Sequence, residues 1–282
     1  MLRKKVNTFI NLALIALLGF VLVAASCKKS PTQAPPKETP PAVEPAPAAE
    51  PQQAKSVEQP AAQPDTNAAV EQKPAAAEAK PAGDLEPIPL VLPKPMFVGT
   101  PQSFRGVSNL EKPLGKARPP FYAPKGTTNV ALNKPVTSSD EQPIIGEIKM
   151  ITDADKEAAD GSYVELGPFK QHVTIDLGSP HNIYAIVIWH YHKQARVYKD
   201  VVVQAADDPD FITNVRTIFN NDDDNSSGLG VGKDLNYVET SEGKLIDAKG
   251  IVARYVRCYS NGNTSNDLNN YIEVEVYGTA AK

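Results

Sequence analysis

The sequence predicts an all-β fold, a two-sheet jelly-roll sandwich, in the C-terminal part of the chain. Residues His172–Leu177 alternate between apolar and polar side chains, as in a strand with one buried face. Ile183–Tyr191 is apolar on both faces, as expected of a central strand covered on both sides, and the β-branched run Val201–Val203 favours a third strand. Gly and Pro recur at short intervals between such segments, which indicates about eight short strands.

Residues 1–26 have the features of an export signal. Basic residues at positions 3–5 precede an apolar stretch, residues 9–23, that is short for a membrane-spanning helix. The run Val-Ala-Ala-Ser-Cys that follows resembles the lipobox of bacterial lipoproteins, whose cysteine is lipidated and becomes the mature N-terminus. The resemblance implies lipidation of Cys27, although Ala24 stands where the family usually has Leu. Ordinary signal cleavage and an uncleaved anchor are the alternatives.

We predict that residues 27–95 form a disordered linker that begins at the lipid-anchored cysteine. Sixteen of the 26 prolines lie between Lys28 and Pro95, and this interval contains no aromatic residue. Such a segment cannot bury enough apolar surface to offset the entropy lost on ordering. Aromatic residues return in residues 96–127, which we expect to form an irregular strap along a folded module, residues 128–279.

The folded module is acidic. From Thr127 to the end, 14 Lys and Arg stand against 23 Asp and Glu, a net charge of −9. Nucleic-acid backbones require clustered basic side chains, so nucleic acid is excluded as a partner. No G-x-S-x-G, H-E-x-x-H or C-x-x-C motif is found, and we do not expect an enzyme. Cys258 alternates with Val256 in a predicted strand, so we interpret it as a small buried residue.

Six segments of the module follow a recurring order. They are NVALNKPVTSS (129–139), ITDADKEAADG (151–161), VTIDLG (173–178), VVVQAADD (201–208), ARYVRCYS (253–260) and YIEVEVYG (271–278). This order resembles the discoidin family, also called coagulation factor V/VIII type C domains, with a galactose-binding-like fold. The resemblance implies a discoidin-like jelly-roll β-sandwich. It implies a function less directly, because one fold hosts many functions.

The same resemblance implies a structural calcium ion. In discoidin-like sugar-binding modules, calcium often lies between the acidic loop and the strand that ends in E-V-x-V-Y-G. The matching groups in this sequence are the Met150 carbonyl, Asp153, Asp155, the Ile272 carbonyl and Glu273. Hard oxygen ligands of this kind suit calcium. A solvated acidic turn is the alternative, since Ala154 stands where the family commonly has Gly.

A second acidic run begins at Asp222. From Asp223 its spacing fits a calcium-binding loop, with Asp234 in the place of the usual bidentate Glu. The preceding Ile218–Asn220 reads as a strand and not as a helix. We therefore favour a solvated loop there.

A ligand site is expected on the loops at one end of the sandwich. Sugar rings bind to aromatic faces and to planar polar groups. The candidate residues are Trp189, His190, His192, Arg196, Asn261 and Asn263. Arg196 matches an arginine that contacts sugar in related carbohydrate-binding modules. The alternatives are a core or edge position for Trp189, and an ion pair of Arg196 with Asp200 or Asp207. For His190 and His192, which lie two residues apart, they are structural or surface roles, or a shared metal ion.

The sequence therefore predicts a non-catalytic, exported lipoprotein of the cell envelope whose module binds a glycan. A protein-binding or adhesion module on the same fold is the alternative. The membrane is reached through the lipid anchor. Lys28 after the cysteine favours the outer membrane if the cell is Gram-negative.

Overall fold

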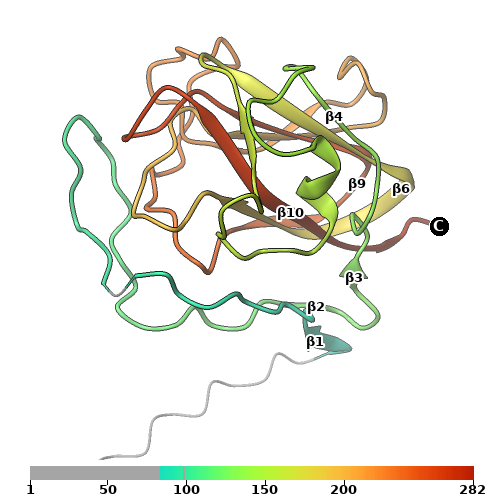
Figure 1. Ribbon diagram of the computed structural model, residues 1–282. Helices are drawn as coiled ribbons and strands as arrows, with labels where there is room; N and C mark the ends of the chain where they lie inside the picture. Colours follow the sequence, from blue (N-terminus) through green and yellow to red (C-terminus); the bar gives the residue numbers. More distant parts are fainter. Residues whose placement is uncertain (1–82, 98) are drawn as a thin grey trace, which may run out of the picture. The chain divides into compact units, whose positions relative to one another are not determined.

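The computed structural model of the protein describes residues 83–97 and 99–282. It confirms the all-β class, with one short 3-10 helix, η1 (Ile148–Thr152), among the strands (Figure 1). The predicted signal (residues 1–26), Cys27 and the linker up to residue 82 lie outside the described residues. Within the described part, no helix is long and apolar enough to span a membrane.

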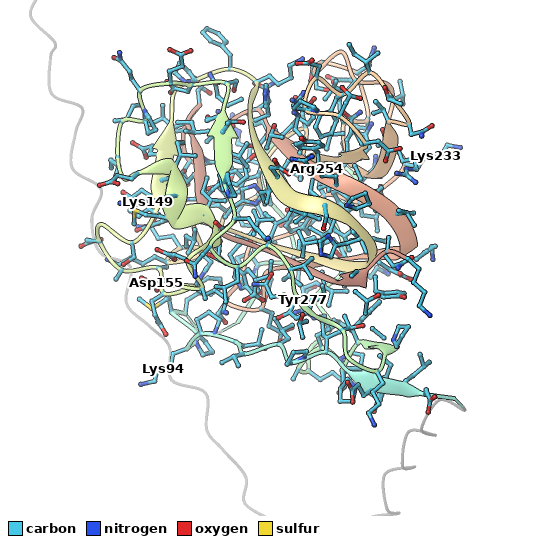
Figure 2. All side chains as sticks on the ribbon, turned by 90° about the vertical axis from the view of Figure 1, so that its right-hand side faces the viewer. Lys94, Lys149, Asp155, Lys233, Arg254 and Tyr277 are labelled. Atoms are coloured by element: carbon cyan, nitrogen blue, oxygen red, sulfur yellow. The ribbon has the colours of Figure 1, made fainter. Side chains whose placement is uncertain are left out.

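The strands differ widely in length, and β6, β9 and β10 are the longest. In chain order they are β1 (Leu85–Pro87), β2 (Tyr122–Pro124), β3 (Thr128–Asn129), β4 (Val136–Ser138), β5 (Val164–Leu166), β6 (Gln171–His190), β7 (Val202–Ala206), β8 (Arg216–Asn220), β9 (Lys244–Ser260) and β10 (Asn269–Ala280). Figure 2 shows the charged Lys149 and Lys233 near the edges of the module, whereas Tyr277 is buried.

Two strands, β6 and β9, belong to both layers of the sandwich. Their halves 171–176 and 255–260 pair with each other, β6 also with β4 and β9 also with β7. Their other halves, 181–188 and 244–253, pair with each other, and β6 also pairs with β10. The first layer is therefore β4-β6-β9-β7-β8, and the second is β9-β6-β10 with β3 and β5 beside β10. All these pairs are antiparallel, and the predicted sandwich is confirmed.

The sequence predicted two strands, His172–Leu177 and Ile183–Tyr191, where the structure has one, β6. The intervening Gly178 has φ +86, and the pairing with β9 shifts register between Asp176 and His181. Arg254 of β9 holds Asp176 at this point through two hydrogen bonds of 2.8 Å. The turn residues therefore bend the strand from one layer into the other instead of ending it.

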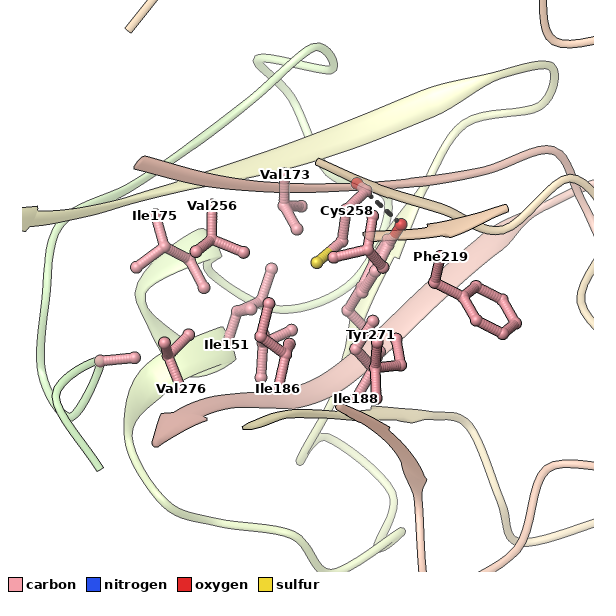
Figure 3. Packing of buried hydrophobic residues seen from close by; sticks show 14 of the residues in the cluster. Ile151, Val173, Ile175, Ile186, Ile188, Phe219, Val256, Cys258, Tyr271 and Val276 are labelled. Carbon is pink, nitrogen blue, oxygen red and sulfur yellow. Dashed lines mark hydrogen bonds between the residues drawn. The ribbon is translucent and has the colours of Figure 1, made fainter. Parts of the chain in front are cut away.

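The main core lies between the two layers. Val173, Ile175 and Leu177 are fully buried, as their alternation predicted. They belong to the same cluster as Ile186 and Val276 of the second layer (Figure 3). Cys258 also lies in this core, and burial raises the pKa of its thiol to about 12. The expectation that Cys258 is a buried structural residue is confirmed.

A smaller core covers the outer face of the second layer, where Ala185, Val187 and Trp189 of β6 lie. Ile88 and Ala123, from the segment that contains the β1–β2 pair, pack on this face. We call it the covered face, and its cover explains why Ile183–Tyr191 is apolar on both sides. The cover also corrects the predicted end of the linker at residue 95, because β1 and Ile88 already belong to the folded part.

Candidate functional site

The structure removes Trp189 from the predicted sugar-binding residues. Its side chain is fully buried on the covered face. The indole Nε1 donates a hydrogen bond of 3.0 Å to the Ser241 carbonyl, and the Lys156 Nζ lies 5.5 Å from the ring centre. Gly243 has φ +62, and a Cβ there would lie 2.7 Å from the indole. The prediction of a stacking platform is therefore wrong, and the core position is confirmed.

The two histidines that follow Trp189 are also fully buried. The His190 Nδ1 lies 3.2 Å from the Glu239 Oε2, and its ring stacks on Tyr198 with centres 4.2 Å apart. The His192 Nε2 lies 3.0 Å from the Lys156 carbonyl and donates to it. Neither ring reaches solvent, so neither can contact a glycan at the surface, and the structural alternative is the correct one.

Arg196 is half-buried, and its Nε has no hydrogen-bond partner among the described residues. Its guanidinium lies 4.6 Å from the centre of the Tyr191 ring, and its Nη1 is 3.5 Å from the Asn270 Oδ1. Among the ion pairs of the described residues, none joins Arg196 to Asp200 or Asp207. The alternative of a structural ion pair is therefore wrong, and a ligand contact by Arg196 stays a prediction.

The two predicted asparagines have different environments. Asn263 is buried, and its Nδ2 donates to the Asn266 Oδ1 at 2.8 Å and to the Leu268 carbonyl at 2.9 Å. It shapes its own loop, which leaves no free group for a ligand and corrects its assignment. Asn261 is only half-buried, donates to the Asp200 Oδ2 at 2.7 Å, and lines a pocket.

This pocket has a volume of about 660 Å³ and lies among loops at one end of the sandwich. The loops follow β5, β6, β8 and β9, and residues 106–108 of the strap complete the wall. We call it the loop pocket. Its lining includes Ser108, Phe169, Val197, Lys199, Asp200, Asn221, Asp223, Asp224, Asn236, Asn261 and Asp267. The sequence predicted a site on loops at one end of the sandwich. Of the six residues that it predicted to bind a ligand, only Asn261 lines this pocket.

One buried side chain, Asn269, joins two loops of the pocket. Its Nδ2 donates to the carbonyls of Gly167 and Phe169, both at 2.8 Å. Its Oδ1 accepts from the Ser260 Oγ and the Gly262 amide, also at 2.8 Å. The side-chain amide of Asn269 thus uses both of its N–H donors and both lone pairs of its oxygen. Asn269 therefore fixes the position from which Phe169 projects.

Phe169 is the exposed aromatic that sequence reasoning missed. It is 79% exposed and has φ +66, a backbone conformation that costs a non-glycine residue roughly 1–3 kcal/mol. Such conformations persist where the surroundings impose them, and they gather at ligand sites. No periodicity marks Phe169 in the sequence. The available signal was an aromatic residue after Gly167-Pro168, in a turn where burial is not expected.

The wall of the loop pocket carries a group of carboxylates. Oxygens of Asp200, Asp222 and Asp224 lie within 4.8 Å of one another. Asp222 is buried and accepts from the Ser226 and Ser227 amides at 3.1 and 2.9 Å. The calcium-loop spacing noted in the sequence does not organise this group, because Asp234 instead accepts from the Asn220 amide at 2.7 Å.

The predicted calcium ligands come from η1, the loop that follows it, and β10. Glu273 is fully buried, and its Oε1 has no hydrogen-bond partner among the described residues. Burial, reinforced by Glu275, raises the pKa of Glu273 to about 9. Its Oε2 accepts from the Ala154 amide at 3.1 Å, and Ala154 has φ +71.

Asp153 and Asp155 lie exposed on the loop after η1, where Figure 2 shows Asp155. Met150 lies in η1, and Ile272 precedes Glu273 in β10. In the described part of the chain, the carboxylate oxygens of Asp153, Asp155 and Glu273 do not all lie within 4.8 Å of one another. A buried carboxylate oxygen without a partner, beneath a loop with two further carboxylates, nevertheless fits the donor set that calcium uses.

Comparisons with known proteins give structural neighbours only. No family model and no curated protein sequence matches the chain. A family 89 glycoside hydrolase from Clostridium perfringens is 20% identical with a TM-score of 0.40; the match covers 54% of this chain and only 15% of the hydrolase. A chitosan-binding module from a chitosanase/glucanase of Paenibacillus sp. IK-5 is 20% identical with a TM-score of 0.39, over 53% of this chain and 98% of the module. A fucose binding module of Streptococcus pneumoniae is 18% identical with a TM-score of 0.38, over 53% of this chain and 96% of the module.

Proposed function

We propose that the protein is a non-catalytic glycan-binding protein and that the loop pocket is its binding site. The observation that carries the proposal is Phe169, an aromatic ring 79% exposed beside a pocket lined mainly by carboxylates, amides and hydroxyls. A sugar ring has an apolar face and a rim of hydroxyls. An aromatic side chain packs on the first, and carboxylate and amide groups hydrogen-bond the second.

The size and build of the pocket agree with this role. Its volume of about 660 Å³ falls within the usual range for small-ligand sites, roughly 300–1,000 Å³. Asn269 and the bond from Asn261 to Asp200 hold the loops in place before any ligand arrives. A preformed site loses less conformational entropy on binding. We expect a Kd on the order of 10⁻⁴ to 10⁻³ M for a short oligosaccharide.

Anchoring in the cell envelope is part of the proposal. The lipobox-like run that ends in Cys27 supports export, lipidation and attachment to a membrane, the outer one if the cell is Gram-negative. The variant Cys27→Ser should leave the membrane fraction or fail to mature. Unchanged mass and unchanged fractionation of this variant would contradict the anchor.

A structural calcium ion completes the proposal. Asp153, Asp155 and Glu273 would hold it, together with the carbonyls of Met150 and Ile272. The unpartnered, buried Oε1 of Glu273 supports this assignment. A cation there would tie the loop after η1 to β10 and so stabilise the folded module.

The test uses the full-length protein in detergent on an array of bacterial and plant glycans, followed by titration with the best oligosaccharide. Phe169→Ala should weaken binding at least about 5-fold with an unchanged melting temperature, because the exposed ring contributes to binding and not to the core. Ile212→Ala is the matched control, since Ile212 is 81% exposed and does not line the pocket. Undiminished binding by Phe169→Ala would reject the loop pocket as the site. A wild-type protein that binds no glycan would favour a protein partner.

A further inference from the structure

We infer that the loop pocket selects glycans with free amino groups, in which the ligand carries positive charge, over neutral or uronate glycans. This inference rests on the proposed function and names its substrate class. The features behind it are the charge of the pocket wall, the partners of its carboxylates, and one buried amide with an unused donor.

The wall of the pocket is strongly acidic. Asp200, Asp223, Asp224 and Asp267 line it, with Lys199 as its basic residue. Behind this lining, Asp222 is buried, and the Lys170 Nζ donates to the Ser227 carbonyl at 2.5 Å. The lining itself has a formal charge of −3, counted from four Asp and one Lys.

None of the lining carboxylates is neutralised by an ion pair within the described part of the chain. Their partners are neutral donors: the Ser226 Oγ and Asn261 Nδ2 for Asp200, and the Ser108 Oγ and Asn109 Nδ2 for Asp223. Hydrogen bonds from neutral donors stabilise a carboxylate without cancelling its charge. The pocket therefore keeps its net negative charge, which attracts a positively charged ligand.

Asp224 shows the same arrangement. Hydrogen bonds from Ser226 lower the pKa of Asp224, which keeps this carboxylate ionised near neutral pH. Asp267 is exposed at the opposite loop of the pocket. A ligand between these two loops would lie between two negative charges.

Asn221 provides a second and independent indication of the ligand. It lines the pocket, is only 3% exposed, and its Nδ2 has no hydrogen-bond partner among the described residues. Its Oδ1 accepts from the Val201 amide at 2.7 Å, which fixes the orientation of the side chain. The unused N–H donor requires an acceptor oxygen. A bare metal ion offers none, whereas a sugar hydroxyl does.

An amino sugar meets these requirements together. Its ammonium group donates to the carboxylates, its hydroxyl oxygens accept from Asn221, and its apolar ring face packs on Phe169. N-acetylation removes the charge and leaves only neutral hydrogen bonds. A uronate brings a second negative charge to the wall and is repelled.

The experiment titrates the full-length protein in detergent with three probes at about pH 6, where an amine carries a proton: a glucosamine hexamer, an N-acetylglucosamine hexamer and a galacturonate hexamer. We expect the glucosamine hexamer to bind roughly 5- to 30-fold more tightly than its acetylated form, because two or more exposed charge pairs at about 0.5–1 kcal/mol each are lost on acetylation. This preference should weaken as salt is raised. The galacturonate should bind most weakly.

A double variant, Asp224→Asn with Asp267→Asn, tests whether these two carboxylates cause the preference for the amine. Both side chains are exposed, so the fold should be unaffected. The preference for the amine should fall to less than about 3-fold, while binding of the acetylated hexamer stays unchanged. Glu141→Gln with Glu147→Gln is the matched control, because it changes net charge equally at exposed residues outside the pocket lining.

The outcomes separate the two proposals. Equal binding of the amine and acetylated hexamers, or tighter binding of the uronate, overturns the preference for amines and leaves glycan binding in place. If the control variant loses the preference for the amine as much as the pocket variant does, the preference does not come from the pocket, and the inference is also overturned. Binding of no hexamer, and of nothing on the glycan array, overturns the proposed function itself.

Discussion

The covered face and the loop pocket both combine an aromatic ring with carboxylates, and they use them in opposite ways. On the covered face, Trp189 is fully buried and Glu275 pairs with Lys156 at 2.7 Å, with both side chains at 10% exposure or less. In the loop pocket, Phe169 is 79% exposed, and the carboxylate of Asp200 has only neutral donors around it.

This difference shows that residue type does not decide between structure and binding. Once a ring is enclosed and the acid beside it is paired with a cation, that ring and that acid have no interaction left for a ligand. When the ring is exposed to solvent and the carboxylates are not paired with a cation, both can still interact with a ligand. Trp189 was the obvious candidate in the sequence because it is the sole tryptophan. Its neighbours in space turn it into a core residue.

The largest expected effect concerns the ring of the covered face. Trp189→Ala should lower the free energy of unfolding by about 3–5 kcal/mol, because it removes a fully buried ring and leaves a cavity. Denaturant unfolding of the purified protein measures it. Phe169→Ala is the paired control and should change stability by less than about 0.5 kcal/mol. Similar losses in both variants would contradict the division into a structural and a binding ring.

Bound calcium would weaken this contrast, because it would make part of the buried side a ligand site as well. Calcium at about 100 times its Kd should stabilise the protein by about 2.7 kcal/mol, since it binds only the folded state. The melting temperature with calcium and with chelator measures this. Glu273→Gln should abolish the shift.

Measurement of the Glu273→Gln variant in chelator provides the control. In chelator, Glu273→Gln should unfold like wild type at neutral pH, because a pKa of about 9 already keeps Glu273 protonated there. A melting temperature that does not respond to calcium, or that responds equally in Glu273→Gln, would remove the metal from the covered face.

The smallest expected effect lies at the pocket end, at His172. Burial, together with Arg257 and Lys170, lowers its pKa from the ordinary 6.5 to about 4. The unfolded chain therefore takes up a proton first as the pH falls. The contribution of His172 to stability is complete above about pH 6.5 and is lost as the pH falls to about 4. Because the ring is only partly buried, we expect a loss of about 1–2 kcal/mol.

Urea unfolding between these two pH values tests this expectation. His172→Gln should flatten the pH dependence by that amount, whereas the control His181→Gln should leave it as in wild type. An unchanged slope in His172→Gln would show that other groups govern acid stability at this end of the module.

The all-β class and the direction of the main buried faces could be predicted from the sequence. Alternation in Val173-Thr174-Ile175 is a local property, and burial follows from it because successive side chains of a strand point to opposite faces. The apolar run Ile183–Tyr191 likewise determined that this strand is covered on both sides. Its alternation with Val256 similarly indicated that Cys258 is a buried structural residue.

Which polar and aromatic groups are available to a ligand depends on contacts between distant parts of the chain. The cover of Trp189 comes from Ile88 and Ala123, and the walls of the loop pocket come from segments as far apart as Ser108 and Asp267. The exposure of a side chain depends on what is packed against it, and those partners lie far away along the chain. A local pattern contains no record of such contacts, so the sequence could identify the loop-bearing end of the sandwich but not the residues that face the ligand.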